Sequence, residues 1–294
     1  MMFPRLIIAA ALSVSATCAF AQEEIVGLWS LNELGCQEPE SLIYQGYSIT
    51  AHIYDDQIEI HPNEFLQARG SSWFLSRSDT SDAFPTLMRA QDGQLEFAWL
   101  DSTPSADEVP GVHEGMLAGE LIPERKPEQF DTSTGESCSG YPLEISLVFG
   151  EALAFLQDLD EAVWTCQGDV RTCPAKIFAV ADVSGDSELS VAEMARVFRA
   201  SLTLGSASSS GSASDEFVAA VTAGFTIAPL ASSAVLHSFD YDRSGGVDLG
   251  ELLTERLPAD WDIGSAPGSM IKSMLDDLGD VARLATGAAS MMMP

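Results

Sequence analysis

The sequence predicts an α+β fold in which an N-terminal antiparallel β-sheet or small β-barrel is followed by an all-α domain. Short runs of alternating apolar and polar residues, separated by turn residues, occupy the first half of the chain. In the second half apolar residues recur every three or four positions, which is the period of an amphipathic helix. Because strands come first and helices afterwards, the pattern favours an α+β protein over an alternating α/β one.

The 294 residues are enough for two domains. We expect a β-rich domain over residues 22–142 and a helical domain over residues 143–264, with a C-terminal amphipathic helix and tail over residues 265–294. A face of Ile, Met, Leu and Val over residues 269–285 predicts that this last helix packs back onto the helical domain.

Residues 1–21 have the pattern of a cleaved signal peptide. Arg5 is followed by an apolar run, and a small-x-small cleavage site ends at Ala21. Cys18 lacks the neighbours of a lipidation site. No later stretch is long and apolar enough to predict a membrane span. We therefore expect an exported protein, periplasmic or secreted.

The chain is strongly acidic. It carries 44 acidic and 14 basic side chains, a formal net charge of −30. Nucleic acids and anionic membrane surfaces would repel such a protein, so neither is expected as a partner.

The β-rich domain is predicted from short alternating runs joined by tight turns. Asp92-Gly93, between two apolar runs, is a hairpin signal. Residues 101–141 are rich in Pro, Gly, Ser and Glu and predict long loops with one or two more strands. The expected strands cover residues 25–31, 47–54, 57–61, 72–76, 86–90 and 95–100.

The opening Gly27-Leu28-Trp29 is similar to the Gly-x-Trp that begins the first strand of lipocalin-like barrels. In that family the Trp plugs the barrel floor and the mouth can hold an apolar ligand. The resemblance thus implies a cavity lined by Trp29 and Trp99, with simple core packing of Trp29 as the alternative.

Catalytic residues are not evident in the sequence. His52, His61 and His113 show no metal-binding spacing, and no Gly-x-Ser-x-Gly turn is present. An enzymatic role is therefore not favoured.

Four cysteines follow the signal peptide, and an even number in an oxidising compartment favours two disulfides with three possible pairings. Proximity favours Cys166–Cys173, which leaves Cys36–Cys138. A zinc site is the competing interpretation, but the cysteines are neither close pairs nor grouped with His.

The helical domain begins near Leu143. Pro174 is expected at the start of a short helix. The Ser- and Gly-rich residues 205–214 predict a flexible insert, after which an extra helix over 215–227 should precede a separate helix that starts at Pro229. The first helix has its apolar stripe at Phe149, Leu153, Leu156, Leu159 and Val163.

Residues 240–251, which we call loop B, place oxygen-bearing side chains at positions 1, 3, 5, 9 and 12 of a twelve-residue loop. From these positions a tight loop can point oxygens at one cation. Gly245 stands at position 6, where the backbone needs a positive φ. The predicted ligands are Asp240, Asp242, Ser244, the Gly246 carbonyl, Asp248 through a water molecule, and Glu251.

Residues 182–193, which we call loop A, follow the same spacing. Ser187 stands where loop B has Gly245, and a left-handed conformation costs such a residue roughly 1–2 kcal/mol. Loop A also has three carboxylate ligands against four, so loop B is expected to bind more strongly. The predicted ligands are Asp182, Ser184, Asp186, the Glu188 carbonyl, Ser190 and Glu193.

Both loops, with their flanking helices, resemble EF-hands. The resemblance implies two Ca²⁺ sites in a paired EF-hand domain, with Leu189 and Val247 facing each other across a two-residue ribbon. The apolar residues that flank the loops are Phe178, Ala181, Met194, Val197 and Phe198 for loop A, and Leu236, Phe239, Leu252 and Leu253 for loop B.

The sequence therefore predicts an exported calcium-binding protein with a structural or interaction role and an unidentified protein partner. One alternative is a calcium sensor that exposes an apolar groove. Another is an enzyme or small-ligand carrier that acts through the β domain and uses calcium as a brace.

Overall fold

The protein forms two compact units, and each is described by itself. Residues 1–50 and 63–140 make one unit, and residues 51–62 and 141–294 make the other. The predicted boundary near residue 142 thus separates most strands from the helices, but the segment 51–62 groups with the helices. The structure, a computed structural model, describes residues 24–31, 35–36, 42–54, 58–67, 73–77, 86–100, 130–166, 172–209, 214–256 and 271. The predicted signal peptide lies outside these residues.

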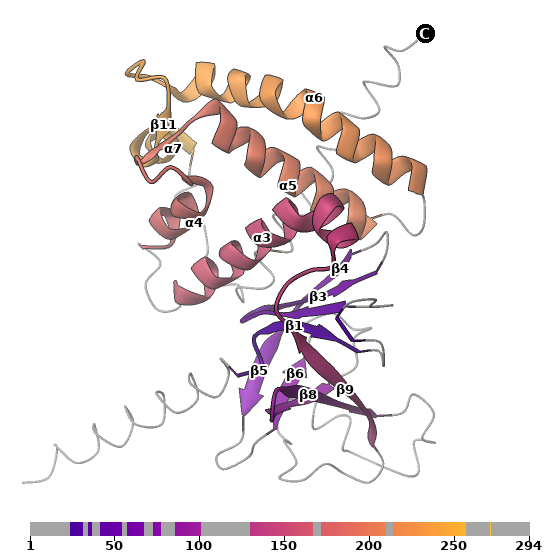
Figure 1. The fold of residues 1–294 in the computed structure, drawn as a ribbon. Helices are drawn as coiled ribbons and strands as arrows, with labels where there is room; N and C mark the ends of the chain where they lie inside the picture. Colours follow the sequence, from indigo (N-terminus) through magenta and orange to yellow (C-terminus); the bar gives the residue numbers. More distant parts are fainter. Residues whose placement is uncertain are drawn as a thin grey trace, which may run out of the picture. The chain divides into compact units, whose positions relative to one another are not determined.

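The N-terminal half forms a nine-stranded sheet, and every pairing whose register is described is antiparallel (Figure 1). This confirms the predicted antiparallel sheet. The strand order is β4-β3-β2-β1-β9-β8-β7-β6-β5. The strands are β1 (Gly27–Ser30), β2 (Leu42–Gln45), β3 (Ile49–Ile53), β4 (Ile58–Pro62), β5 (Glu64–Gln67), β6 (Phe74–Arg77), β7 (Thr86–Gln91), β8 (Gln94–Leu100) and β9 (Phe130–Cys138).

The strand order runs through neighbours in sequence. Strand β9 pairs with β1, so the last strand of the sheet returns to the first. Only Asn63 separates β4 from β5, the strands at the two ends of the order. Closure of the sheet into a small barrel remains a prediction.

The Asp92-Gly93 hairpin turn is confirmed. Both residues have a positive φ, 55° and 78°, and Gln91 pairs with Gln94 across them. Two successive positive φ values are the mark of a type I′ turn, whose twist matches that of the flanking strands.

Three strands lie outside the six that alternation predicts. Strands β2 and β5 are only four residues long, too short to show a period. Strand β9 falls within residues 101–141, where one or two strands were expected, but its sequence is mostly polar. At its centre a side chain on Gly135 would meet the backbone of Ser30 at 3.2 Å and Trp29 Cβ at 3.4 Å. The close approach of the β9 and β1 backbones therefore explains why this segment forms a strand better than its apolar pattern does.

Trp29 is a core residue of the first unit. It is 4% exposed, and its indole N–H donates to the Ile25 carbonyl at 3.1 Å. The side chain of Trp99 lies outside the described residues, so the predicted cavity stays a prediction. The apolar cluster around Trp29 contains Ile25, Ile43, Phe74, Met88, Leu95 and Phe97.

The C-terminal half is helical, as predicted (Figure 1). The apolar stripe of the first helix is buried, with each of its five predicted residues at most 2% exposed. None of the described helices has the length and apolar character needed to cross a membrane. The helices are α3 (Leu143–Thr165), α4 (Cys173–Ala181), α5 (Val191–Ser209), α6 (Ser214–Phe239) and α7 (Leu249–Arg256).

The flexible insert is wrong for residues 205–209, which continue helix α5. Helix α5 packs along α6, and this contact outweighs the poor helix propensity of a Ser-rich segment (Figure 1). The Ser206 hydroxyl donates back to the Leu202 carbonyl at 2.6 Å. Residues 210–213 lie outside the described part of the chain.

The expected break at Pro229 is also wrong, because α6 is one helix with Pro229 inside it. Proline removes the hydrogen bond to the carbonyl four residues before, which belongs to Phe225. Pro229 is exposed and Phe225 is 65% exposed, so water can bond the freed carbonyl. The free-energy cost of Pro229 inside the helix is thereby reduced, and α6 continues through it.

Both predicted disulfides are present. Cys36 and Cys138 have Cα atoms 5.5 Å apart and join the β1–β2 connection to β9. Cys166 and Cys173 have Cα atoms 5.1 Å apart and join the end of α3 to the start of α4. Of the predicted C-terminal helix only Ile271 is described; it is helical and fully buried.

Candidate functional site

Loops A and B lie beside each other and pair through a short ribbon. Strand β10 (Glu188–Leu189) of loop A pairs antiparallel with β11 (Val247–Asp248) of loop B. Leu189 lies opposite Val247, as predicted.

One apolar cluster holds the helices that flank the two loops. Eight of its ten members come from matching positions in the two loops and their flanking helices, since the loops begin 240 − 182 = 58 residues apart; the other two members are Val235 and Leu249. Leu253 is 38% exposed, while Val197 and Phe198 are half-buried. The pairs with this separation are Phe178 and Leu236, Ala181 and Phe239, Leu189 and Val247, and Met194 and Leu252.

The two loops share a backbone shape at their turns. In loop A, Gly185 and Ser187 at positions 4 and 6 have φ values of 71° and 69°. In loop B, Arg243 and Gly245 at the same positions have φ values of 63° and 94°. Each loop therefore has one glycine and one strained residue, with the positions exchanged.

The strain predicted for Ser187 is confirmed, whereas that of Arg243 was missed. Loop A has a glycine at position 4, and this glycine indicated that Arg243, at position 4 of loop B, would also need a positive φ. Because both loops carry one such residue, backbone strain does not distinguish them.

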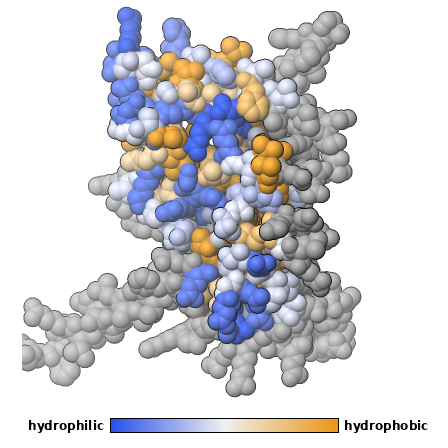
Figure 2. Space-filling view, viewed as in Figure 1, coloured by the Kyte–Doolittle hydropathy of each residue, from blue (hydrophilic) through white to orange (hydrophobic). Residues whose placement is uncertain are grey.

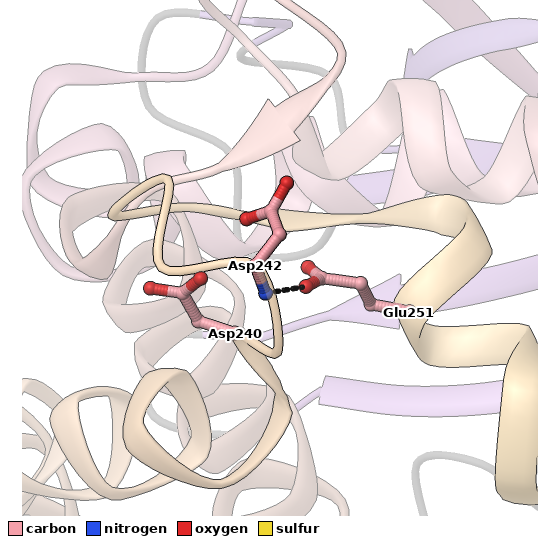
Figure 3. Close-up of side chains that lie close together, drawn as sticks. All are labelled: Asp240, Asp242 and Glu251. Atoms are coloured by element: carbon pink, nitrogen blue, oxygen red, sulfur yellow. Dashed lines mark hydrogen bonds between the residues drawn. The ribbon is translucent and has the colours of Figure 1, made fainter.

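Three carboxylates of loop B converge. Ligand oxygens of Asp240, Asp242 and Glu251 lie within 4.8 Å of one another (Figure 3). Oxygens that bind one Ca²⁺ at 2.3–2.6 Å are at most about 5 Å apart, so the spacing fits that ion. Asp240 follows α6, and Glu251 stands in the first turn of α7. The group thus spans the helices before and after the loop.

Backbone N–H groups hold the aspartates of loop B in place. Asp240 accepts from the N–H groups of Ser244 at 3.0 Å and Gly245 at 3.1 Å. Asp242 accepts from Ser244 N–H at 2.8 Å. The Ser244 hydroxyl lies 3.3 Å from the Gly246 carbonyl oxygen, so two more predicted ligands are neighbours.

Glu251 ties the two ends of loop B together. Its Oε1 accepts from the N–H group of Tyr241 at 2.7 Å and from that of Asp242 at 3.3 Å, and Figure 3 draws the second of these bonds. Its Oε2 accepts from Asp248 N–H at 3.0 Å, and Glu251 N–H donates to Asp248 Oδ1 at 2.7 Å. This reciprocal pair is a capping box for α7.

Loop A has the same capping arrangement at α5. Glu193 Oε2 accepts from Ser190 N–H at 2.9 Å and from the Ser190 hydroxyl at 2.8 Å, while Oε1 accepts from Ser184 N–H at 2.8 Å. Glu193 is 8% exposed. Burial alone would raise the pKa of Glu193, but the backbone N–H groups of Ser184 and Ser190 outweigh it and lower the pKa to about 2.

The remaining predicted ligands of loop A are less convergent. Asp182 accepts from the N–H groups of Gly185 and Ser187 at 2.8 and 2.9 Å, and the Ser184 hydroxyl donates to it at 3.2 Å. Asp186 accepts from Glu188 N–H at 3.1 Å. Asp182, Ser184, Ser190 and Glu193 therefore form one hydrogen-bonded chain.

The chain matches no protein-family model, no curated protein and no solved structure in the comparisons made. The site is therefore interpreted from its own geometry.

The oxygen chemistry of both loops suits a hard cation. Carboxylate, hydroxyl and carbonyl oxygens are ligands of Ca²⁺ and Mg²⁺, and neither loop contains nitrogen or sulfur ligands among its predicted positions. In Figure 2 hydrophilic side chains gather at the upper left, where Figure 1 draws the turn between α6 and β11. Tyr241, Asp242 and Arg243 of this turn are exposed, so an ion can reach it from solvent.

Proposed function

We propose that the protein is an exported calcium-binding protein whose loops A and B are a pair of EF-hand loops with a structural role. The observation that carries the proposal is the convergence of Asp240, Asp242 and Glu251 in a loop that pairs with a second one of the same spacing. The shared apolar cluster, most of whose members stand at matching positions around the two loops, supports the pairing.

The proposed role of calcium is to neutralise crowded carboxylates. Without a cation the charges of Asp240, Asp242 and Glu251 repel one another within a few ångström. A bound ion converts this repulsion into attraction and joins residues on both sides of the loop. Since Asp240 follows α6 and Glu251 begins α7, the ion fixes the angle between these helices.

Loop A extends the same mechanism to the other helices. Glu193 stands in the first turn of α5, and Asp182 follows α4. Two ions would therefore hold four helices around one apolar cluster. This arrangement favours calcium as a permanent brace.

The calcium affinity that we expect is that of a structural site in an extracellular protein. Extracellular calcium modules bind at about 10⁻⁴–10⁻³ M. With millimolar calcium, a site of about 10⁻⁴ M stabilises the folded state by roughly 1.4 kcal/mol. Such a site stays occupied, and removal of its ion lowers the stability of the folded state.

Thermal unfolding with and without a chelator tests this proposal. We expect millimolar Ca²⁺ to raise the melting temperature of the oxidised protein and calorimetric titration to give two sites per chain. Submicromolar constants would contradict the permanent-brace role and favour a sensor. An unchanged melting temperature together with no heat of binding would overturn calcium binding itself.

A further inference from the structure

Two histidines and a glutamate that the calcium sites do not use lie together on strands β3 and β4. The rings of His52 and His61 are 5.6 Å apart between centroids, at an interplanar angle of 81°. His61 Nε2 lies 3.8 Å from Glu59 Oε2. Two imidazoles and one carboxylate thus meet on one hairpin.

All three side chains belong to the more open face of the hairpin. Successive side chains of a strand point to opposite faces, and the intervening Ile53, Ile58 and Ile60 are at most 8% exposed. The side chains of His61 and Glu59 are 38% and 44% exposed. An ion from solvent can therefore reach them.

The ring spacing fits two imidazoles that share one ion. Zinc binds His nitrogen at about 2.0–2.1 Å in tetrahedral geometry, which places the centroids of two bound rings about 5 Å apart. The observed 5.6 Å between His52 and His61 is close to this value. We propose that His52, His61 and Glu59 form a binding site for a divalent transition metal such as Zn²⁺, separate from the calcium loops.

Glu59 would supply the third ligand after a rotation of its side chain. The three ligand atoms are not gathered within 4.8 Å, as those of loop B are. The proposal requires rotation about the side-chain bonds of His61 and Glu59, both of which are partly exposed. Water completes the tetrahedron, as it does in zinc sites with three protein ligands.

The ligand set makes this site selective against calcium. Imidazole suits Zn²⁺, Cu²⁺ and Ni²⁺, whereas Ca²⁺ takes oxygen ligands.

A zinc titration of the oxidised protein, carried out with saturating Ca²⁺, tests the site. We expect one Zn²⁺ per chain and a loss of affinity of at least about tenfold in His61→Gln. Glu59→Gln should give a smaller loss. His237→Gln, which removes an exposed imidazole on α6, is the matched control and should bind as wild type does. Wild-type affinity in His61→Gln would overturn the proposal.

Spectroscopy with Cu²⁺ identifies the ligands of the bound ion directly. Electron paramagnetic resonance should show coupling to two imidazole nitrogens in the wild type and to one in His61→Gln. Displacement of Zn²⁺ or Cu²⁺ by Ca²⁺ would assign the ion to the acidic loops and overturn the separate site. Glu251→Gln should weaken calcium binding and leave zinc binding unchanged, so the two proposals can fail independently.

Discussion

Loops A and B have the same backbone plan and different side-chain chemistry. Both have positive φ values at positions 4 and 6, a capping box at positions 9 and 12, and one strand of a shared ribbon. Loop B has carboxylates at four of its predicted ligand positions, whereas loop A has three and uses hydroxyls at two others. Local hydrogen bonding therefore gives both loops the same shape, although they differ in the number of their carboxylates.

The two loops differ in the hydrogen bonds that their carboxylates accept. In loop A the Ser184 and Ser190 hydroxyls donate to Asp182 and Glu193, which offsets part of the negative charge. In loop B, Asp240, Asp242 and Glu251 converge and accept from backbone N–H groups. We therefore infer that loop B gains more from calcium than loop A does.

The largest effect is expected from Glu251→Gln, which keeps the shape of the side chain but removes its charge. The tighter calcium constant should weaken on the order of 100-fold, about 2.7 kcal/mol. Glu193→Gln should instead weaken the looser constant. Calorimetric titration measures both, with Glu161→Gln on the exposed face of α3 as the matched control. If neither constant changes in Glu251→Gln, the comparison of the loops is wrong.

Acid titration in the presence of a chelator should follow Glu193. Its pKa is about 2 in the folded protein against an ordinary value of 4.5. A lowered pKa stabilises the fold fully above pH 4.5, and this contribution is lost as the pH falls from 4.5 toward 2. Urea unfolding should show the loss in wild type and a flatter profile in Glu193→Gln. An identical profile in the two proteins would show that the capping box of loop A contributes little.

Removal of the Cys166–Cys173 disulfide should affect loop A more than loop B. The bridge closes a short loop at the start of α4, and its loss should lower the free energy of unfolding by about 2–3 kcal/mol. Because α4 leads into loop A, the looser calcium constant should weaken several-fold in the Cys166→Ser, Cys173→Ser double variant. Replacement of Cys36 and Cys138 by Ser is the control and should leave both constants unchanged.

The smallest effects are expected at the exchanged glycine positions. Ser187→Gly and Arg243→Gly should each stabilise the calcium-saturated protein by about 1 kcal/mol, because both residues have a positive φ. Gly185→Ala and Gly245→Ala should destabilise it by a similar amount, and no atom lies within 4 Å of the added methyl group in either case. Thermal unfolding measures all four. If Ser187→Gly raised the stability and Arg243→Gly did not, backbone strain would distinguish loop A from loop B.

Spacing and periodicity predicted most of the helical half. The register of Leu189 against Val247 and the buried stripe of α3 follow from positions that repeat along the chain. The disulfide pairing followed from separation in sequence, with no structural information.

The errors arise where tertiary packing outweighs local preference. Residues 205–209 have the composition of a linker, yet packing along α6 makes them helical. Pro229 marks a helix start in isolation, but on an exposed face its lost hydrogen bond costs less. Strand β9 has almost no apolar pattern and is fixed by its two neighbours, β1 and β8. Likewise, the meeting of His52 with His61 depends on a hairpin whose register the sequence does not specify.

Equilibrium dialysis of the oxidised protein against about 1 mM Ca²⁺ tests the central claim most directly. We expect two bound ions per chain in the wild type and a loss of the tighter one in Glu251→Gln. Recovery of the protein without bound calcium, or with the same amount in wild type and in the Glu193→Gln, Glu251→Gln double variant, would contradict it.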